Sequence, residues 1–187
     1  SVSSFIPSML EKGNIDLLLS KPVSRPKIIL AKFLGGVLLI FLSLVYMIGF
    51  VWLILSSKSG FWHVPFLYSI LWLTLSFAII YSLIIFIGLI SQSSILSIIV
   101  SLFLVFIVCP VLYLREETIF SLVNNEVVRF IINFFYYILP KPTDINQIST
   151  DMITGNPVKS YMPVFSSVLF MLAALSASIF YFKKKDY

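Results

Sequence analysis

The chain has 187 residues, of which 59% are hydrophobic and only 11% are charged, and its formal net charge is +5. An average soluble domain is about 25% charged, and a chain of this length could not bury so many apolar side chains away from water. The basic residues flank apolar stretches instead of forming one patch, which argues against a nucleic-acid partner. Composition therefore predicts an all-α, polytopic helical membrane protein whose main partner is the lipid bilayer.

Four apolar stretches are each long enough to cross a bilayer, because a hydrocarbon core of about 30 Å needs roughly 20 apolar residues in a helix. None contains Asp, Glu, Lys or Arg, each of which would cost roughly 3 kcal/mol at the centre of a span. Backbone groups in lipid must pair within their own segment, so we expect helices. The predicted spans are residues 33–55, 66–90, 95–114 and 161–182, and they make up a transmembrane domain of residues 33–182.

Lys and Arg gather in the segments before the first span and after the last, residues 1–32 and 183–187. Cytoplasmic segments keep positive charge, and four spans return the chain to the side from which it started. Both ends are therefore expected in the cytoplasm, with the protein in the plasma membrane. The loop of residues 115–160, in which acidic residues balance the basic ones, is then expected on the far side.

That loop contains an apolar stretch, residues 127–139, which Arg129 and Asn133 interrupt. The stretch is too short and too polar to span, and it favours an extracytoplasmic interfacial or re-entrant helix. Tyr136 and Tyr137 suit the headgroup zone, although packing of a loop on the bundle explains them equally well. The polar run that follows, residues 140–157, contains three prolines and predicts an exposed connection.

A few single residues carry further expectations. Pro110 predicts a kink in the third span, and His63, the only histidine, is expected in a loop at headgroup level rather than as a metal ligand. The last span has small residues at a spacing that lets helix backbones approach closely. We expect them to form a packing face within the subunit or across a dimer, with a substrate-facing wall as the alternative. These residues are Ala173, Ala174, Ala177 and Ser178.

Enzymatic motifs are missing from the sequence. It has no G-x-x-x-x-G-K-[ST] phosphate loop, no H-E-x-x-H, no G-x-S-x-G and no pair of carboxylates inside a span. Cys109 is the only cysteine, so no disulfide within the chain and no thiolate metal site can form. The chain is therefore not expected to be an enzyme or to hold a metal or cofactor. Spans without charge also argue against a proton or sodium relay.

The first 32 residues mix apolar and charged side chains in a pattern typical of short amphipathic helices at a surface. Gly13 can end one helix and Asn14 can cap the next, while Pro22 stops the second helix and Pro26 is tolerated in the first turn of the first span. A segment of this kind, joined without slack to a span, suits mechanical coupling. An ordinary juxtamembrane loop on lipid headgroups is an equally good interpretation.

The stretch EKGNIDLLLSKPVSR, residues 11–25, followed by Lys32-Phe33-Leu34, resembles the cytoplasmic loop of type 2 ABC exporter permeases, the ABC-2 family. The chain's ending, residues 181–186, is also similar to that family's C-terminus. By resemblance, residues 1–32 carry a coupling helix that docks on a separate cytoplasmic ABC ATPase subunit, which holds ATP and Mg²⁺. The residues implied in that interface are Glu11, Gly13, Asp16, Leu18, Leu19, Pro22 and Arg25.

The same resemblance implies a second permease subunit, identical or different, and two further spans ahead of Ser1, because members of the family normally have six. The expected function is thus the permease subunit of an ATP-driven transporter, an exporter by resemblance. The alternative is a non-transporting membrane scaffold that uses the same loop to recruit another cytoplasmic protein. An intramembrane enzyme ranks below both.

Overall fold

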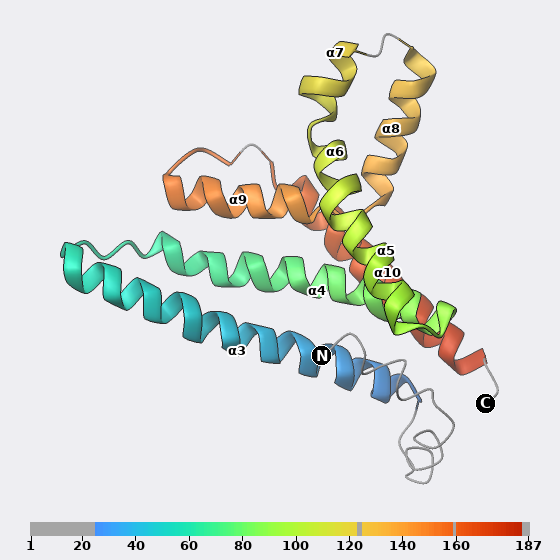
Figure 1. Ribbon diagram of the computed structural model, residues 1–187, viewed down its shortest axis with the longest axis horizontal. Coiled ribbons are helices and arrows are strands. Elements are labelled where there is room, and N and C mark those ends of the chain that lie inside the picture. Colours follow the sequence, from blue (N-terminus) through green and yellow to red (C-terminus); the bar gives the residue numbers. More distant parts are fainter. Residues whose placement is uncertain (1–24, 123–124, 159, 185–187) are drawn as a thin grey trace.

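The structure is a computed structural model that describes residues 25–122, 125–158 and 160–184, and every regular element in these ranges is a helix (Figure 1). Four helical segments are long and apolar enough to cross a membrane. They are α3 (Arg25–Ser59), α4 (Pro65–Ser91), the continuous run formed by α5 (Ser94–Phe103), a π-helical turn (Leu104–Val108) and α6 (Cys109–Tyr113), and α10 (Met162–Lys184). The all-α polytopic fold predicted from the sequence is confirmed.

The first of these helices differs most from its predicted bounds, because α3 begins at Arg25 rather than at residue 33. Pro26 lies in its first turn, where a missing N–H leaves no hydrogen bond unmade. The helix continues through Lys27 and Lys32, whose long stems allow a charged end to reach beyond an apolar surface. Hydropathy marks only the apolar part of such a helix, so the predicted span, residues 33–55, is shorter than the helix that contains it.

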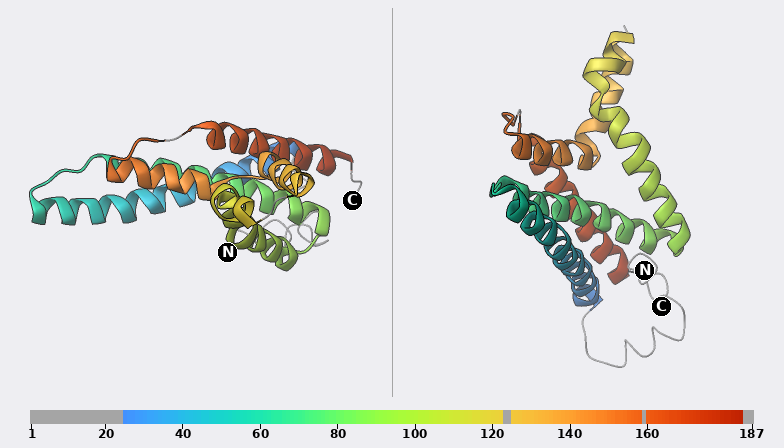
Figure 2. Two further views of the ribbon diagram at one scale, coloured as in Figure 1. Left: turned by 90° about the horizontal axis from the view of Figure 1, so that it is seen from above. Right: turned by 60° about the vertical axis from the view of Figure 1, so that its left-hand side comes forward.

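Helix α4 is the centre of the bundle. It packs against α3, α5, α10 and a further helix, α9 (Pro142–Thr154). Half of the most hydrophobic 18-residue stretch of α4 is buried inside the protein, whereas only 6% of the corresponding stretch of α3 is buried. Figure 2 shows α3 along one side of α4 and α10 crossing it on another. Ile79 and Ile85 of α4 are fully buried, whereas α3 leaves most of its apolar surface for the surrounding membrane.

A close approach joins α3 to α4 at Gly36. The ring of Tyr81 lies against this glycine so closely that a Cβ there would be 2.5 Å from Tyr81 Cε1. Tyr81 also stacks on Phe33 and Phe77, with ring centroids 6.0 and 5.4 Å apart. Glycine at position 36 is therefore needed for the aromatic stack that holds the two helices together.

Several hydroxyl groups in the bundle are bonded within their own helices. Ser82 Oγ donates to Ile79 O at 2.7 Å, and Ser178 Oγ donates to Ala174 O at 2.7 Å. Both serines are buried. Bonds of this kind satisfy a polar group in an apolar interior without a partner on another helix.

The disturbance expected at Pro110 takes the form of the π-helical turn just before it, in which the Cys109 N–H donates to Leu104 O. Proline has no N–H and its ring crowds the carbonyl of the preceding turn. One wider turn shifts the hydrogen-bond register and so accommodates the proline inside the helix. After Leu114 the chain makes a second π turn (Arg115–Ile119) and a short helix, α7 (Phe120–Leu122).

The connection between α7 and α10 contains two helices, α8 (Glu126–Ile138) and α9. The first agrees with the helix expected near residues 127–139. The prediction that residues 140–157 form an exposed connection is wrong, because α9 packs along α4 and buries Ile145 and Ile148. Pro142 occupies the first helical turn and Gly155 ends the helix in a left-handed conformation, with φ 74°. Both residues mark the ends of a helix, not a loop.

Candidate functional site

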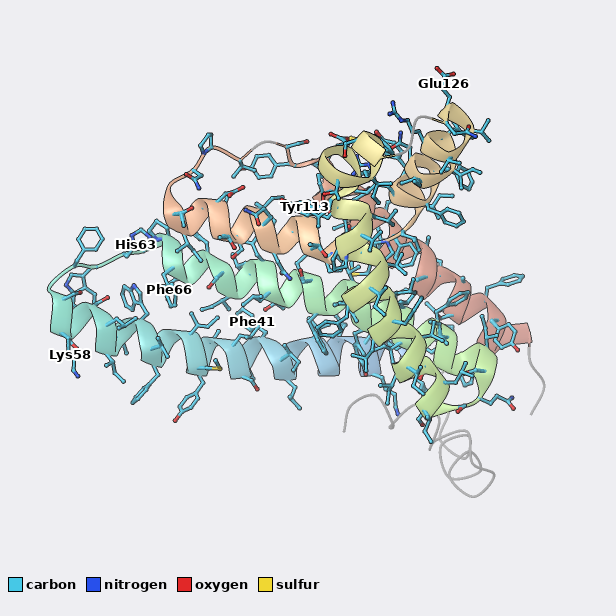
Figure 3. The ribbon with its side chains drawn as sticks, turned by 45° about the horizontal axis from the view of Figure 1, so that its top comes forward. Phe41, Lys58, His63, Phe66, Tyr113 and Glu126 are labelled. Carbon is cyan, nitrogen blue, oxygen red and sulfur yellow. The ribbon has the colours of Figure 1, made fainter. Side chains whose placement is uncertain are left out.

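Four ionisable or aromatic polar side chains meet where α6 ends, in a group that we name the polar cluster. Arg115 follows α6, Tyr136 lies on α8, Lys141 lies in the turn between α8 and α9, and Asp144 lies in the first turn of α9. Figure 3 labels Tyr113, at the end of α6 and two residues before Arg115, and Glu126, at the opposite end of α8 from Tyr136. Arg115 and Lys141 are both buried.

The guanidinium group of Arg115 has partners on each of its three nitrogens. Its central carbon lies 3.3 Å from the centroid of the Tyr136 ring, a cation–π contact. Nε donates to Asn133 Oδ1 at 3.1 Å and Nη2 forms an ion pair with Glu116 Oε1 at 2.8 Å. A third donor, Nη1, bonds to Leu112 O at 3.2 Å. These partners make a buried cation tolerable, and they bind α8 to the end of α6.

Lys141 ties the turn between α8 and α9 to α10. Its backbone N–H donates to Ser167 Oγ at 2.9 Å and its Nζ donates to Ser166 Oγ at 2.6 Å. The neighbouring Pro140 O accepts from Cys109 Sγ at 3.4 Å. Ser166 lies about 6 Å along α10 from its start, and Cys109 about 6 Å before the end of α6. The turn therefore enters between the ends of two membrane helices.

The Tyr136 hydroxyl donates to Asp144 Oδ1 at 2.8 Å, and this bond connects α8 to α9. Burial raises the pKa of Asp144, and the hydrogen bond from Tyr136 and the charge of Lys141 oppose that rise. Burial raises the pKa of Tyr136 and lowers the pKa of Lys141, with the carboxylate of Asp144 opposing the latter shift. Burial in a region of low dielectric thus disfavours the charged form of each group. For Asp144 and Lys141, the neighbouring opposite charge offsets part of that penalty.

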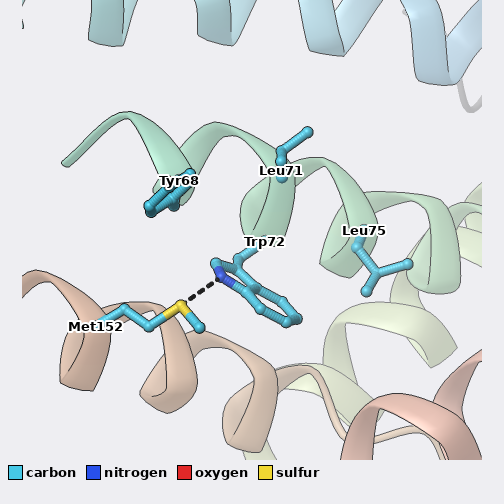
Figure 4. A pocket seen from close by; sticks show the side chains of 5 residues that line it. All are labelled: Tyr68, Leu71, Trp72, Leu75 and Met152. Carbon is cyan, nitrogen blue, oxygen red and sulfur yellow. Dashed lines mark hydrogen bonds between the residues drawn. The ribbon is translucent and has the colours of Figure 1, made fainter. Parts of the chain in front are cut away.

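Two cavities adjoin these helices. One has a volume of about 450 Å³ beside the polar cluster, and its walls include Tyr113, Tyr137, Gln147 and Asp151. The other, about 300 Å³, lies against α4 and α9 and is lined almost wholly by apolar atoms (Figure 4). Its residues are Tyr68, Leu71, Trp72, Leu75 and Met152. The Trp72 indole N–H points to Met152 Sδ at 3.2 Å, so even this polar group meets a soft apolar partner.

Helix α9 also makes hydrogen bonds near both of its ends, to α4 and to the α3–α4 connection. Ser76 Oγ donates to Asn146 Oδ1 at 3.0 Å, and His63 Nε2 lies 2.9 Å from Ile153 O, as a hydrogen bond with the proton on Nε2 requires. Trp52 Nε1 donates to His63 O at 2.9 Å. The histidine therefore braces the α3–α4 connection against α9. Within the described ranges, no three His, Cys, Asp or Glu side chains are grouped to hold a metal ion.

Of the residues predicted for the coupling interface, only Arg25 lies among the described residues. Glu11, Gly13, Asp16, Leu18, Leu19 and Pro22 lie outside the described residues. Arg25 is the first residue of α3, so the segment that ends there leads directly into a membrane helix.

The four small residues of the last span do not share one face. Ala174 and Ser178 are buried, whereas Ala173 and Ala177 are exposed on the surface of the subunit. The structure therefore brings only Ala174 and Ser178 into the packed interior of this chain. A role for Ala173 and Ala177 in a contact with a second subunit stays a prediction.

The polar cluster was not predicted. The sequence marked Tyr136 as a headgroup-level residue and left Lys141 and Asp144 in a loop. One signal was available, since Tyr136 and Asp144 flank a Leu-Pro-Lys-Pro run that forces a turn, so their side chains can meet across it. Contacts between Lys141 and Ser166 depend on tertiary packing and left no local pattern.

Comparison with known proteins shows which family the chain resembles. The chain fits the family model described as ABC-2 family transporter protein over residues 6–187, a range that includes the segment of residues 11–25 and all four membrane helices. No curated protein and no solved structure matches the chain. The match confirms the resemblance seen in the sequence and identifies a multi-pass permease subunit of an ABC transporter, a class that associates with an ABC ATPase subunit and the lipid bilayer. This chain belongs to the ABC-2 transporter family.

Proposed function

We propose that this chain is the membrane-spanning subunit of an ATP-driven exporter in the plasma membrane, and that a separate subunit binds Mg²⁺ and ATP and hydrolyses the nucleotide. The observation that carries the proposal is the family match, which extends from residue 6 through the last membrane helix. The sequence contains no phosphate-binding loop, which supports placing ATP hydrolysis on a partner subunit.

The proposed route of coupling is the segment of residues 11–25. Glu11, Asp16 and Arg25 supply polar contacts to the ATPase, and Leu18 and Leu19 anchor it in an apolar groove. Gly13 and Pro22 set the ends of the short helices. Support comes from α3, whose first residue, Arg25, is the last residue of this segment, so a displacement at that end would act on a 35-residue helix.

Two such permeases would form the pathway, each with both ends in the cytoplasm. The excess of Lys and Arg before α3 and at the end of α10 supports this orientation. The exposed small residues Ala173 and Ala177 would suit a close contact between subunits.

The coupling segment is tested with the double variant Asp16→Ala, Leu19→Ala, purified and reconstituted with the ATPase subunit. We expect both copurification of the ATPase and the ATP hydrolysis measured in proteoliposomes to fall at least several-fold. The matched control is Asp151→Ala, Leu55→Ala, which changes the same residue types at positions on α9 and α3. If the coupling variant kept full association and full hydrolysis, the assignment of this segment would be wrong. Association without any ATP-dependent transport would instead favour a scaffold.

A further inference from the structure

Helix α9 is attached to α4 by a hydrogen bond whose acceptor is a sulfur atom. The indole N–H of Trp72, on α4, donates to Met152 Sδ, on α9, at 3.2 Å (Figure 4). Two other bonds of α9 have oxygen acceptors, one on the side chain of Asn146 and one on the backbone of Ile153. Of these acceptors, the thioether sulfur is the one that peroxides oxidise. The Trp72–Met152 bond therefore differs in its chemistry from the bonds on either side of it.

Space beside Met152 allows a small oxidant to reach it. Met152 is partly exposed, and it forms part of the wall of the apolar cavity of about 300 Å³ against α4. A cavity needs only about 10–15 Å³ to hold a water molecule, and hydrogen peroxide has one oxygen atom more than water. Met47 and Met162 are more exposed, but they lie on α3 and at the start of α10. Their oxidation would leave the contact between Trp72 and α9 unchanged.

We propose that Met152 is an oxidation site, at which conversion to the sulfoxide by hydrogen peroxide breaks the bond to Trp72 and loosens α9 from α4. A lone pair of Met152 Sδ attacks one peroxide oxygen, so that an S–O bond forms while the O–O bond breaks. Sulfur loses two electrons, and the departing hydroxide takes them and accepts the proton of the transferred oxygen, leaving as water. The product, methionine sulfoxide, is polar, and sulfoxide reductases can convert it back to the thioether.

The distance of 3.2 Å between Trp72 Nε1 and Met152 Sδ determines the consequence of oxidation. An N–H···O hydrogen bond alone needs about 2.9 Å between nitrogen and oxygen, so an oxygen atom between this nitrogen and this sulfur forces the two side chains apart. Oxygen added on the opposite side of the sulfur draws electrons from it, which leaves the indole N–H with a poorer acceptor and puts a polar atom in an apolar cavity. Either product weakens the attachment of α9 near its C-terminal end.

The proposal is tested by amide hydrogen exchange in residues 142–154, with the full chain and its ATPase reconstituted in nanodiscs and treated with hydrogen peroxide. Mass spectrometry follows both sulfoxide formation and exchange, which reports local opening of the helix. Met152→Leu keeps a similar apolar volume and cannot form a sulfoxide. Met162→Leu is the matched control, because it removes an exposed methionine away from the Trp72 contact. Trp72→Phe keeps an aromatic ring but has no indole N–H to lose.

Peroxide treatment is expected to raise the exchange rate in residues 142–154 at least several-fold in the wild type and in Met162→Leu. The rate should stay unchanged in Met152→Leu and rise less in Trp72→Phe than in the wild type. Sulfoxide at Met152 with unchanged exchange would overturn the proposal, and so would full oxidation of Met162 while Met152 stays reduced. A rise equal to that of the wild type in Met152→Leu or in Trp72→Phe would also overturn it. None of these results bears on ATP coupling, since the readout does not depend on transport.

Discussion

Asp144 shows what a single residue costs and contributes in this protein. Its carboxyl group accepts a hydrogen bond from Tyr136 and lies near Lys141, yet burial still raises its pKa. A raised pKa means that the folded state holds the proton more tightly than the unfolded state. The contribution of Asp144 to stability is therefore present at low pH and is lost as the pH rises through the folded pKa.

Replacement of Asp144 by Asn tests this balance, because the amide keeps an oxygen for Tyr136 but cannot ionise. We expect the stability of the variant relative to the wild type to increase as the pH rises above about 3.9, the ordinary pKa of an unfolded Asp, and to level off above the folded pKa. Thermal unfolding in detergent at a series of pH values measures the difference. Asp151→Asn on the same helix is the control, because the Asp151 carboxylate accepts from Gln147 and not from Tyr136. Parallel curves for wild type and Asp144→Asn would contradict the assignment.

At the scale of elements, the contact between α3 and α4 depends on a missing side chain. The buried Tyr81 ring occupies the space beside Gly36 and is held by Phe33 and Phe77. Gly35, one residue earlier, has no atom within 4 Å of a Cβ built there. Of these two adjacent glycines, only Gly36 packs against another helix. Substitutions at the two positions can therefore be compared directly, with Gly35 as the control.

Gly36→Ala is expected to destabilise the fold by about 1–3 kcal/mol, the usual cost of overpacking. Gly35→Ala should be neutral or stabilising by up to about 1 kcal/mol, because alanine is the better residue inside a helix. Unfolding in mixed micelles of SDS and mild detergent measures both. Equal effects from the two variants would show that Tyr81 moves aside freely and that the close approach does not hold the helices.

At the scale of the whole molecule, the membrane environment, the four spans and the family could all be predicted from the sequence. Charge-free runs such as residues 66–90 allow only a helix in lipid, which is why α4 was predicted within one residue at each end. Helix α9 was missed because its average composition is polar and its prolines suggested a loop, although Ile145 and Ile148 already showed helical spacing. The polar cluster joins residues up to 29 positions apart, from Arg115 to Asp144, and Lys141 connects it to Ser166 on α10. Local sequence patterns do not record such packing.

The predicted orientation of the whole molecule is tested by labelling. Lys58→Cys lies at the far end of α3 and Lys184→Cys at the end of α10. Because positive charge stays in the cytoplasm, an impermeant maleimide should label Lys58→Cys in intact cells and Lys184→Cys only after permeabilisation. The parent chain, whose single Cys109 is buried, is the control. A reversed pattern would place both ends outside.

The buried serines have a consequence for motion. Ser82 on α4 and Ser178 on α10 use their hydroxyl groups on carbonyls of their own helices. If α10 slides or rotates against α4, these two bonds travel with their own helices and need not break. Neither hydroxyl ties one helix to the other, a property that would suit the proposed transport cycle, in which the helices rearrange and return to their starting positions.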